Sequence, residues 1–342
     1  MVRAPQNEQK ASPVDDSRTP IRTNTDLLHC AAFFSSAPDA MNACAILNPT
    51  AGSTQQQVLQ AALEELAIDQ WRTQGPGDAT DRAAAAAAAD YDRVIAMGGD
   101  GTIHEVVNGL MTVDAPPTLG IVPLGTGNDL ARTLALPTDP LEALALVADG
   151  EPRAVDLIRI RAADGPTHYG VNAATGGFSG QVDEELTSEM KRRWGPLAFL
   201  LGAVSALPDI KSYETRMAFD DEAFAVVDAL NIVVANGRMA GGGKPVAPVA
   251  NPEDGLLDVV IVHAGTLVEL SQVAAQLIAG TYLDHPLVTH RRVRSVRVEA
   301  SPGMWFNVDG ELLTNEPVTF EAVPQALPVV VGPAYQATPP AP

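Results

Sequence analysis

The hydrophobic and polar positions in the first half of the chain predict strands that lead into glycine-rich loops and then into helices. The clearest case is the apolar run 94–97, a predicted buried strand, which leads directly into Gly98-Gly-Asp-Gly-Thr102. Residues 103–110 then carry apolar positions at helical spacing. This layout is typical of a phosphate-binding loop, because glycines expose backbone N–H groups and a helix N-terminus attracts an anion. The alternative is a tight turn after a strand.

Two further loops have the same layout. A predicted strand at 43–47 leads into Asn48-Pro-Thr-Ala-Gly52, and a predicted strand at 119–123 leads into Leu124-Gly-Thr-Gly-Asn-Asp129. Three glycine loops after apolar strands predict a parallel sheet that binds its ligand at the carboxyl ends of the strands. The same half of the chain has a predicted strand at 68–73 and predicted helices at 55–67 and 83–89.

Beyond about residue 150, short strands separated by turn residues replace the strand–helix pattern. The predicted strands lie at 154–161, 169–174, 215–219, 223–228, 230–235, 256–262, 293–299 and 318–331, and helices are predicted at 182–207 and 267–279. Many short strands indicate an antiparallel β domain. We therefore predict an α/β plus β fold, with an N-terminal α/β domain and a C-terminal antiparallel β domain.

Composition and charge limit the partners of this chain. The net charge of −20 argues against nucleic acid, and contact with an anionic membrane would require a local basic patch. Two segments provide one, Lys191-Arg-Arg-Trp194 and His290-Arg-Arg-Val-Arg294, although a solvated charged face is the alternative. No apolar run has the length of a membrane span, and the two cysteines, Cys30 and Cys44, lack metal-ligand spacing. We expect a cytoplasmic protein with peripheral membrane contact.

The two ends of the chain differ from the rest. Residues 1–40 are rich in Pro, Ser, Thr, Asn and Asp, which predicts a disordered tail. Met41 stands directly before the first predicted strand and is a plausible start of translation. Residues 335–342 predict a second, loose tail.

Two groups of carboxylates point to chemistry. Asp100 lies within a glycine loop, where a carboxylate beside phosphates implies a divalent metal or a proton to be moved, with a helix cap as the alternative. Asn307, Asp309 and Glu311 alternate, so on a strand all three side chains would lie on one face. The alternative there is a hairpin turn, for which Asp-Gly is a favoured pair. A hydroxyl that attacks phosphorus needs a base of this kind.

Five motifs in a fixed order resemble the diacylglycerol kinase catalytic family. They are the three loops Asn48–Gly52, Gly98–Thr102 and Pro123–Asp129, followed by Asp254-Gly-Leu-Leu-Asp258 and Asp309-Gly-Glu311. The resemblance covers about residues 41–331 and is to the bacterial soluble lipid kinases. It implies a nucleotide-binding α/β domain of the NAD-kinase and diacylglycerol-kinase type at 41–150 plus 316–334, and a β-sandwich lipid-substrate domain at 151–315.

The resemblance also implies ATP as phosphoryl donor and Mg²⁺ as its metal. Asp100 would hold the ion, and Asp309 would be the base for a lipid hydroxyl, with Glu311 orienting substrate or metal; these two roles can be exchanged. A structural Mg²⁺ or Ca²⁺ is expected on Asn251, Asp254 and the Leu256 carbonyl, with a plain turn as the alternative. The expected nucleotide-binding residues are Asn48, Pro49, Thr50, Ala51, Gly52, Thr73, Gly98, Gly99, Asp100, Gly101, Thr102, Ile103, His104, Gly125, Thr126, Asn128 and Asp129.

Several positions keep two interpretations. Asp129 can support the metal region or cap a helix, and Arg132 can be a counter-charge or pair on a helix surface. Gly241-Gly-Gly243 gives close backbone approach to substrate or is a flexible loop. The histidines form no spaced cluster and favour structural or exposed roles.

Three activities are compatible with the sequence. The first is an ATP-dependent lipid kinase of phospholipid metabolism, acting on diacylglycerol by preference, or on phosphatidylglycerol, ceramide or a long-chain base. The second is NAD kinase, which shares the Gly98–Thr102 motif but fits the Pro123–Asp129 and Asp309–Glu311 motifs less well. The third is a catalytically silent lipid or nucleotide binder, against which the presence of both Asp100 and Asp309 argues. A homodimer is compatible with the resemblance.

Overall fold

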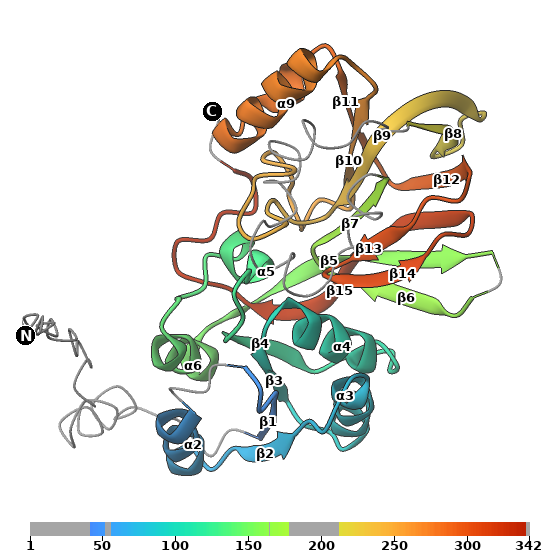
Figure 1. Cartoon of the computed structure of the whole chain (residues 1–342). Coiled ribbons are helices and arrows are strands. Elements are labelled where there is room, and N and C mark those ends of the chain that lie inside the picture. Colours follow the sequence, from blue (N-terminus) through green and yellow to red (C-terminus); the bar gives the residue numbers. More distant parts are fainter. Residues whose placement is uncertain (1–41, 52–55, 164, 178–211, 340–342) are drawn as a thin grey trace, which may run out of the picture. The chain divides into compact units, whose positions relative to one another are not determined.

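The structure is a computed structural model that describes residues 42–51, 56–163, 165–177 and 212–339 (Figure 1). Its first part contains a parallel sheet. In spatial order, the strands are β2 (Asp69–Arg72), β1 (Ala43–Leu47), β3 (Arg93–Gly98) and β4 (Thr118–Pro123). The chain therefore adds strands on both sides of β1, and the strand order changes direction between β1 and β3. Open α/β sheets bind ligands beyond the carboxyl ends of the strands at such a point.

Helices cover both faces of the parallel sheet (Figure 1). Cys44 and Ile46 of β1 belong to the core under one pair of helices, and Ala43 and Ala45 belong to the core under the other pair. Strands that are buried on both faces read as continuous apolar runs, which is why the sequence predicted them. The first pair is α3 (Asp78–Ala88) with α4 (Asp100–Leu110), and the second is α2 (Gln56–Glu65) with α6 (Pro140–Asp149).

The first turn of α3 is capped by a side chain from α4. Gly77, which precedes α3, offers no side chain to the N–H groups of this turn. The carboxylate of Glu105 instead accepts hydrogen bonds from the backbone N–H groups of Gly77 (2.9 Å) and Ala79 (3.1 Å). Its charge lies at the positive end of the α3 dipole. Glu105 thereby joins α3 to the helix that follows the Gly98–Thr102 loop.

Replacing Glu105 with Ala is expected to lower the free energy of unfolding by about 1–2 kcal/mol, because two N–H groups at the start of α3 lose their acceptor. Urea denaturation followed by far-UV circular dichroism measures the change. Glu65→Ala, an exposed position at the end of α2, is the control and should stay within about 0.5 kcal/mol of the wild type. Equal stability of Glu105→Ala and the wild type would show that the cap has no energetic role.

The second part of the protein is built from antiparallel strands around two cores. One core contains Phe306 and Phe320, whose ring centroids are 5.0 Å apart, and the other lies under α9 with Leu270 and Val273. The strands are β5 (Pro152–Ala162), β6 (Thr167–Gly170), β7 (Ala173–Gly177), β8 (Tyr213–Phe219), β9 (Ala225–Ala235), β10 (Leu257–His263), β11 (Val288–Val293), β12 (Ser295–Ser301), β13 (Phe306–Val308), β14 (Glu311–Thr314) and β15 (Val318–Val330). Among the described residues of this part, α9 (Leu267–Ala279) and the 3-10 turn η1 (Tyr282–Asp284) are helical, whereas the short helix α5 (Asp129–Thr133) packs in the core of the first part.

The last strand, β15, connects the two parts of the protein. It pairs antiparallel with β5 and β12, and near its end Val329 pairs parallel with Leu119 of β4. The parallel and antiparallel strands therefore form one hydrogen-bonded network. The predicted α/β plus β fold class is confirmed, and the domain boundaries given above stay a prediction. None of the helices that the structure describes combines the length and the apolar character needed to cross a membrane.

Two strand predictions were wrong in detail. The strand predicted at 169–174 is interrupted between β6 and β7, because the N–H groups of Val171 and Asn172 donate to a carboxylate and not to a neighbouring strand. The strands predicted at 223–228 and 230–235 are one continuous strand, β9.

Part of the predicted loose tail is held in place. The guanidinium of Arg238 donates hydrogen bonds to the carbonyls of Gln336 and Ala337, so the expectation of a loose segment is wrong for these residues. The predicted helix 182–207, with the basic patch 191–194, lies outside the described residues, as does the tail 1–40.

Candidate phosphotransfer site

The three predicted glycine loops meet beyond the carboxyl ends of β1, β3 and β4. The side-chain Nδ2 of Asn48, after β1, donates to Thr102 Oγ1 at 3.2 Å. The Asn48 N–H donates to the Met97 carbonyl at 3.1 Å, and the Leu124 N–H donates to the Gly98 carbonyl at 2.8 Å. These bonds continue the parallel pairing past the strand ends. They bring all three motifs to the point where the strand order changes.

Glycine is required where the loops after β3 and β4 pass each other. A Cβ on Gly125 would lie 2.6 Å from the Gly99 Cα, and a Cβ on Gly127 would lie 2.8 Å from Asp100 Oδ2. Gly99 is also the N-cap of α4 and has no side chain to offer the first N–H groups of that helix. N–H groups at a helix start that lack a side-chain acceptor are suited to bind phosphate. The loops therefore fit the phosphate groups of a nucleotide.

Asp100 carries a negative charge in an unfavourable place. Burial and the charge of Asp129, followed by that of Asp309, raise the pKa of the Asp100 carboxyl to about 6. Hydrogen bonds from the backbone N–H groups of Asp129 and Leu130 oppose this rise in pKa, and the Asp129 N–H donates to Asp100 Oδ1 at 2.9 Å. A buried carboxylate among like charges is a position that a cation would stabilise. Asp100 thus fits the predicted Mg²⁺ on chemical grounds.

The other loop residues differ in what they can offer a nucleotide. Pro49, Thr50 and Thr126 are exposed at this edge of the sheet, and Thr73 is buried just after β2. Gly52 lies outside the described residues. Asn48 shapes its own loop, since its Oδ1 accepts from the Thr50 N–H at 3.0 Å and from the Thr50 hydroxyl at 2.7 Å.

Ile103 has little to offer a nucleotide. Its side chain is fully buried in the core under α3 and α4. Its N–H donates to the Gly99 carbonyl at 3.1 Å. The next residue, His104, is also buried and contacts Asp309, as described below. The helical segment of the predicted motif therefore faces the protein interior from Ile103 onward.

Asp129 has a role that the sequence did not suggest. The N-cap of α5 is Asn128, so the helix-cap interpretation of Asp129 was wrong. The Asp129 carboxylate instead accepts from the N–H groups of Gly242 (3.0 Å) and Gly243 (2.5 Å) in the long loop between β9 and β10. Gly241, Gly242 and Gly243 all have positive φ, between 64° and 84°, which favours glycine at each position.

Replacing Asp129 with Ala is expected to lower the free energy of unfolding by about 2–3 kcal/mol, because two charge-assisted hydrogen bonds are lost. Thermal unfolding of the two proteins measures the effect. Asp139→Ala removes the side-chain cap of α6 and is the comparison, with an expected loss of about 1 kcal/mol. A smaller loss for Asp129→Ala than for Asp139→Ala would contradict the role assigned to Asp129.

Of the two interpretations of the Asp309 motif, a strand or a hairpin turn, the structure shows the hairpin turn. Asp309 and Gly310 connect β13 to β14 and have φ values of 50° and 102°. Two positive φ values are typical of a type I′ turn, for which Asp-Gly is favoured. The strand interpretation, in which Asn307, Asp309 and Glu311 would share one face, was therefore wrong. Asp309 is buried, whereas Glu311 is exposed.

The Asp309 carboxylate is surrounded by donors. Oδ1 accepts from the N–H groups of Asn172 (3.0 Å) and Ala173 (2.9 Å). Oδ2 accepts from the Val171 N–H at 2.8 Å and lies 3.4 Å from Nδ1 of His104. Val171 and Asn172 lie in the connection between β6 and β7, Ala173 is the first residue of β7, and His104 belongs to α4. Asp309 therefore fixes the turn to both parts of the protein.

His104 is a buried partner of Asp309. Burial lowers the pKa of His104, but the hydrogen bond and charge of Asp309, together with the charges of Glu311 and Glu105, outweigh it and leave the pKa raised. The raised pKa means that this pair stabilises the fold at low pH, below the ordinary value of 6.5, and that the contribution is lost as the pH rises through the pKa of the folded protein.

Asn108, one turn after His104, ties α4 to the edge of the β part. Its Nδ2 donates to the Tyr169 carbonyl at 2.8 Å, and its Oδ1 accepts from the Tyr169 N–H at 2.9 Å. Sequence reasoning missed Asn108 and the pairing of His104. The helical spacing of the two residues places them on the same face of α4, but only the structure shows what that face contacts.

The predicted structural metal ligands do not form a metal cage. Asp254 Oδ1 accepts from the Leu256 N–H at 3.0 Å, and its Oδ2 pairs with Arg292. Asn251 Oδ1 accepts from the Glu253 N–H at 3.0 Å. Across the described residues, no group of three or more His, Cys, Asp or Glu side chains is placed to hold a metal ion. These contacts fit the plain-turn interpretation, with the Arg292 guanidinium as the counter-charge of Asp254.

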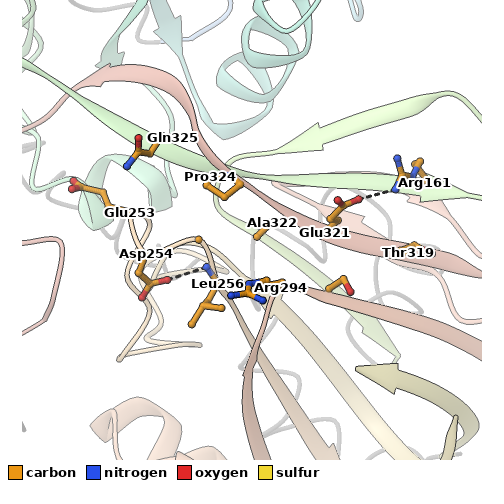
Figure 2. A pocket seen from close by; sticks show the side chains of 12 residues that line it. Arg161, Glu253, Asp254, Leu256, Arg294, Thr319, Glu321, Ala322, Pro324 and Gln325 are labelled. Carbon is orange, nitrogen blue, oxygen red and sulfur yellow. Dashed lines mark hydrogen bonds and ion pairs between the residues drawn. The ribbon is translucent and has the colours of Figure 1, made fainter. Parts of the chain in front are cut away.

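Asp254 also lines a cavity of about 750 Å³ beside β12 and β15, shown in Figure 2 with Arg294 and Glu321. The cavity contains neither Asp100 nor Asp309. Acidic side chains contact most of the basic patch 290–294, since Arg291 pairs with Glu222, Arg292 pairs with Asp254, and His290 Nε2 lies 2.7 Å from Asp258 Oδ1. The Arg294 guanidinium has no side-chain partner within the part of the chain that the structure describes.

The fold and the site together define a class of protein. A sheet edge suited to bind phosphate, with a buried carboxylate, stands next to carboxylates carried on an antiparallel β part, which is the layout of a two-part phosphotransferase. Residues 42–160 match the diacylglycerol kinase catalytic domain family, and residues 172–331 match the YegS C-terminal NAD kinase beta sandwich-like domain.

Known proteins show the same relationship along most of the chain. A diacylglycerol kinase from Staphylococcus saprophyticus is 34% identical over 275 residues, which cover 78% of this chain and 87% of that protein. A diacylglycerol kinase from Bacillus subtilis strain 168 is 35% identical over 236 residues, 69% of this chain and 76% of that protein. A crystal structure of a candidate diacylglycerol kinase from Bacillus anthracis strain Sterne has a TM-score of 0.75 at 25% identity and covers 88% of this chain and 99% of that one.

The chain belongs to the diacylglycerol kinase family. The resemblance drawn from the five motifs is thereby confirmed, and so is the enzyme class, a lipid kinase.

Proposed function

We propose that this protein transfers the γ-phosphoryl group of ATP to the free hydroxyl of diacylglycerol and forms phosphatidic acid. The observation that carries the proposal is the meeting of two sets of groups. The Asp309-Gly310-Glu311 turn of the β part lies against the start of α4, where a Cβ on Gly101 would be 2.9 Å from Glu311 Oε1. The carboxylates that can act on a hydroxyl therefore lie next to the N–H groups that can bind phosphate.

The residues divide the work of phosphoryl transfer between the two parts of the protein. The N–H groups at the start of α4 bind and orient the phosphate groups, and the loops Asn48–Ala51 and Gly125–Asn128 enclose the nucleotide. Asp100 would hold Mg²⁺, which, when bound, offsets the negative charge of the transferring phosphoryl group. A carboxylate of the 309–311 turn accepts the proton of the attacking hydroxyl.

The acceptor is inferred from the relatives and from the fold. Proteins that are about one-third identical to this chain are named diacylglycerol kinases. Diacylglycerol resides in the bilayer, so we further propose that the protein works at a cytoplasmic membrane surface as a peripheral enzyme. A structural metal on Asn251, Asp254 and Leu256 is not part of the proposal, because the Arg292 guanidinium already provides the counter-charge of the Asp254 carboxylate.

The proposal is tested by incubating the full chain with labelled ATP and Mg²⁺, in mixed micelles with diacylglycerol and, separately, with NAD. Label in a chloroform-soluble phosphate ester, and none in the Asp100→Asn protein, supports the lipid kinase. Label in NADP alone would overturn it. Binding of ATP without transfer to any lipid would favour the silent binder.

A further inference from the structure

The carboxylates that line the cavity beside β12 and β15 all have arginine partners (Figure 2). Three carboxylates line it, and each forms an ion pair with at least one guanidinium group. The negative charge of the lining is therefore offset by the protein itself, and a cation has little to gain there. The pairs are Glu253 with Arg153, Asp254 with Arg292, and Glu321 with Arg159 and Arg161.

Arg294 is the cation of this lining that has no such partner. Its backbone N–H donates to Asp220 Oδ1 at 2.8 Å, which fixes the residue at the start of β12. Its side chain is exposed, and its guanidinium forms no ion pair with any residue that the structure describes. A free guanidinium offers several N–H donors in a planar fork that matches the oxygens of a phosphate group. Arg294 therefore makes the cavity suitable for an anion.

The floor of the cavity is the outer face of the antiparallel sheet. Arg161 of β5 pairs with Thr319 of β15, and Glu321 of β15 pairs with Ser295 of β12. Residues that alternate with these along the strands, such as Phe320, are buried in the core. The floor thus places the hydroxyl groups of Ser295 and Thr319 on the same side of the sheet as the guanidinium of Arg161.

The wall of the cavity is held in place from behind by Asp156. This carboxylate is fully buried and accepts from the backbone N–H groups of Gly255, at 2.6 Å, and Gln325, at 2.7 Å. Gly255 lies in the turn before β10, and Gln325 lies in the irregular stretch of β15 where its pairing with β5 shifts register. The wall is therefore built from fixed backbone. Three apolar side chains complete the lining, from Leu256, Ala322 and Pro324.

We propose that this cavity binds a phosphate monoester, with Arg294 as the main contact of the phosphate group and the hydroxyls of Ser295 and Thr319 as further donors. The apolar side chains would contact the carbon part of the ligand. The site contains neither Asp100 nor Asp309, so it is separate from the phosphotransfer site and its occupation does not require kinase activity. A soluble metabolite and the headgroup of phosphatidic acid both present a phosphate monoester.

The test is isothermal titration calorimetry on the full chain with excess ADP, using glycerol 3-phosphate and, separately, short-chain dihexanoyl phosphatidic acid. Glycerol and dihexanoyl phosphatidylcholine are the matched probes without a monoester. We expect Arg294→Ala to raise the Kd of the bound monoester by about 10-fold or more, because charge-assisted hydrogen bonds are lost. Its melting temperature should match the wild type, since the side chain is exposed. Arg216→Ala, an exposed arginine on β8 outside the lining, should keep the wild-type Kd.

The two probes also identify the source of the ligand. Saturable binding of glycerol 3-phosphate that depends on Arg294 supports a soluble ligand, and such binding of the short-chain lipid alone supports a lipid headgroup. The proposal would be overturned if neither monoester bound, or if Arg294→Ala bound both as tightly as the wild type, as expected for phosphate held at the start of α4. Because binding is measured without turnover, a failure of the proposed kinase function leaves this result unaffected.

Discussion

Replacing Asp100 with Asn is expected to lower the rate of phosphate transfer by about 10³-fold, since the amide cannot hold the divalent ion that offsets phosphate charge. The substitution keeps the local fold, because an Asn oxygen can still accept from the Asp129 N–H. Steady-state kinetics with saturating diacylglycerol measures kcat. Asp114→Asn, an exposed position just after α4, is the matched control and should keep wild-type kcat.

The same Asp100→Asn protein should be more stable than the wild type at pH 8 without metal, by on the order of 2 kcal/mol. The pKa of Asp100 is raised to about 6 by burial, then by Asp129 and Asp309, so its contribution to stability is full below about pH 3.8 and is lost as the pH rises through about 6. The stability difference should therefore shrink as the pH falls through 6. A variant with wild-type kcat, or one that is less stable at pH 8, would contradict the assignment of Asp100.

Replacing Gly109 with Ala is expected to lower the free energy of unfolding by about 2 kcal/mol, although the residue lies in a helix. Helix propensity alone would favour Ala by about 0.5–1 kcal/mol. Here a Cβ would lie 2.2 Å from the Thr80 carbonyl oxygen and 2.6 Å from the Ala83 Cβ, so α3 and α4 would have to separate. Overpacking of this kind costs about 1–3 kcal/mol and outweighs the gain in propensity.

Gly101→Ala provides the comparison within the same helix. Its Cβ would meet the Glu311 Oε1 at 2.9 Å, and this flexible side chain can move. We therefore expect the stability of Gly101→Ala to stay within about 0.5 kcal/mol of the wild type. Urea denaturation measures both variants. If Gly109→Ala were as stable as Gly101→Ala, the close approach of α3 and α4 would have no energetic weight.

The nucleotide half of the protein could be predicted from the sequence because its signals are local. β1, β3 and β4 are apolar runs buried on both faces, and each glycine loop follows its strand directly. The parallel order then places all three loops at one edge. No local sequence signal predicts that β15 pairs with β4. This pairing is defined only by the contact of Val329 with Leu119, which are far apart in the sequence.

The second half of the site could not be predicted because its determinants are far apart in sequence. The bonds of Asp309 to the residues at 171–173 join positions more than 130 residues apart. The bonds of Asp129 to the loop at 242–243 have a similar separation. Alternation suggested a strand through Asp309 and hid the turn, although the Asp-Gly pair was a sign of it. The Asp254–Arg292 pair could likewise not be predicted, because Arg292 lies outside the 254–258 motif that suggested a metal site.

The most direct test of the central claim is the identity of the phosphorylated product when acceptors compete. The wild-type protein is given ATP and Mg²⁺ with equimolar diacylglycerol, phosphatidylglycerol, ceramide and a long-chain base in the same mixed micelles, and the lipids are analysed by mass spectrometry. The proposed function predicts that phosphatidic acid is the predominant product and that it is absent with Asp100→Asn. Phosphorylation of another lipid in its place, or of none, would contradict diacylglycerol as the acceptor.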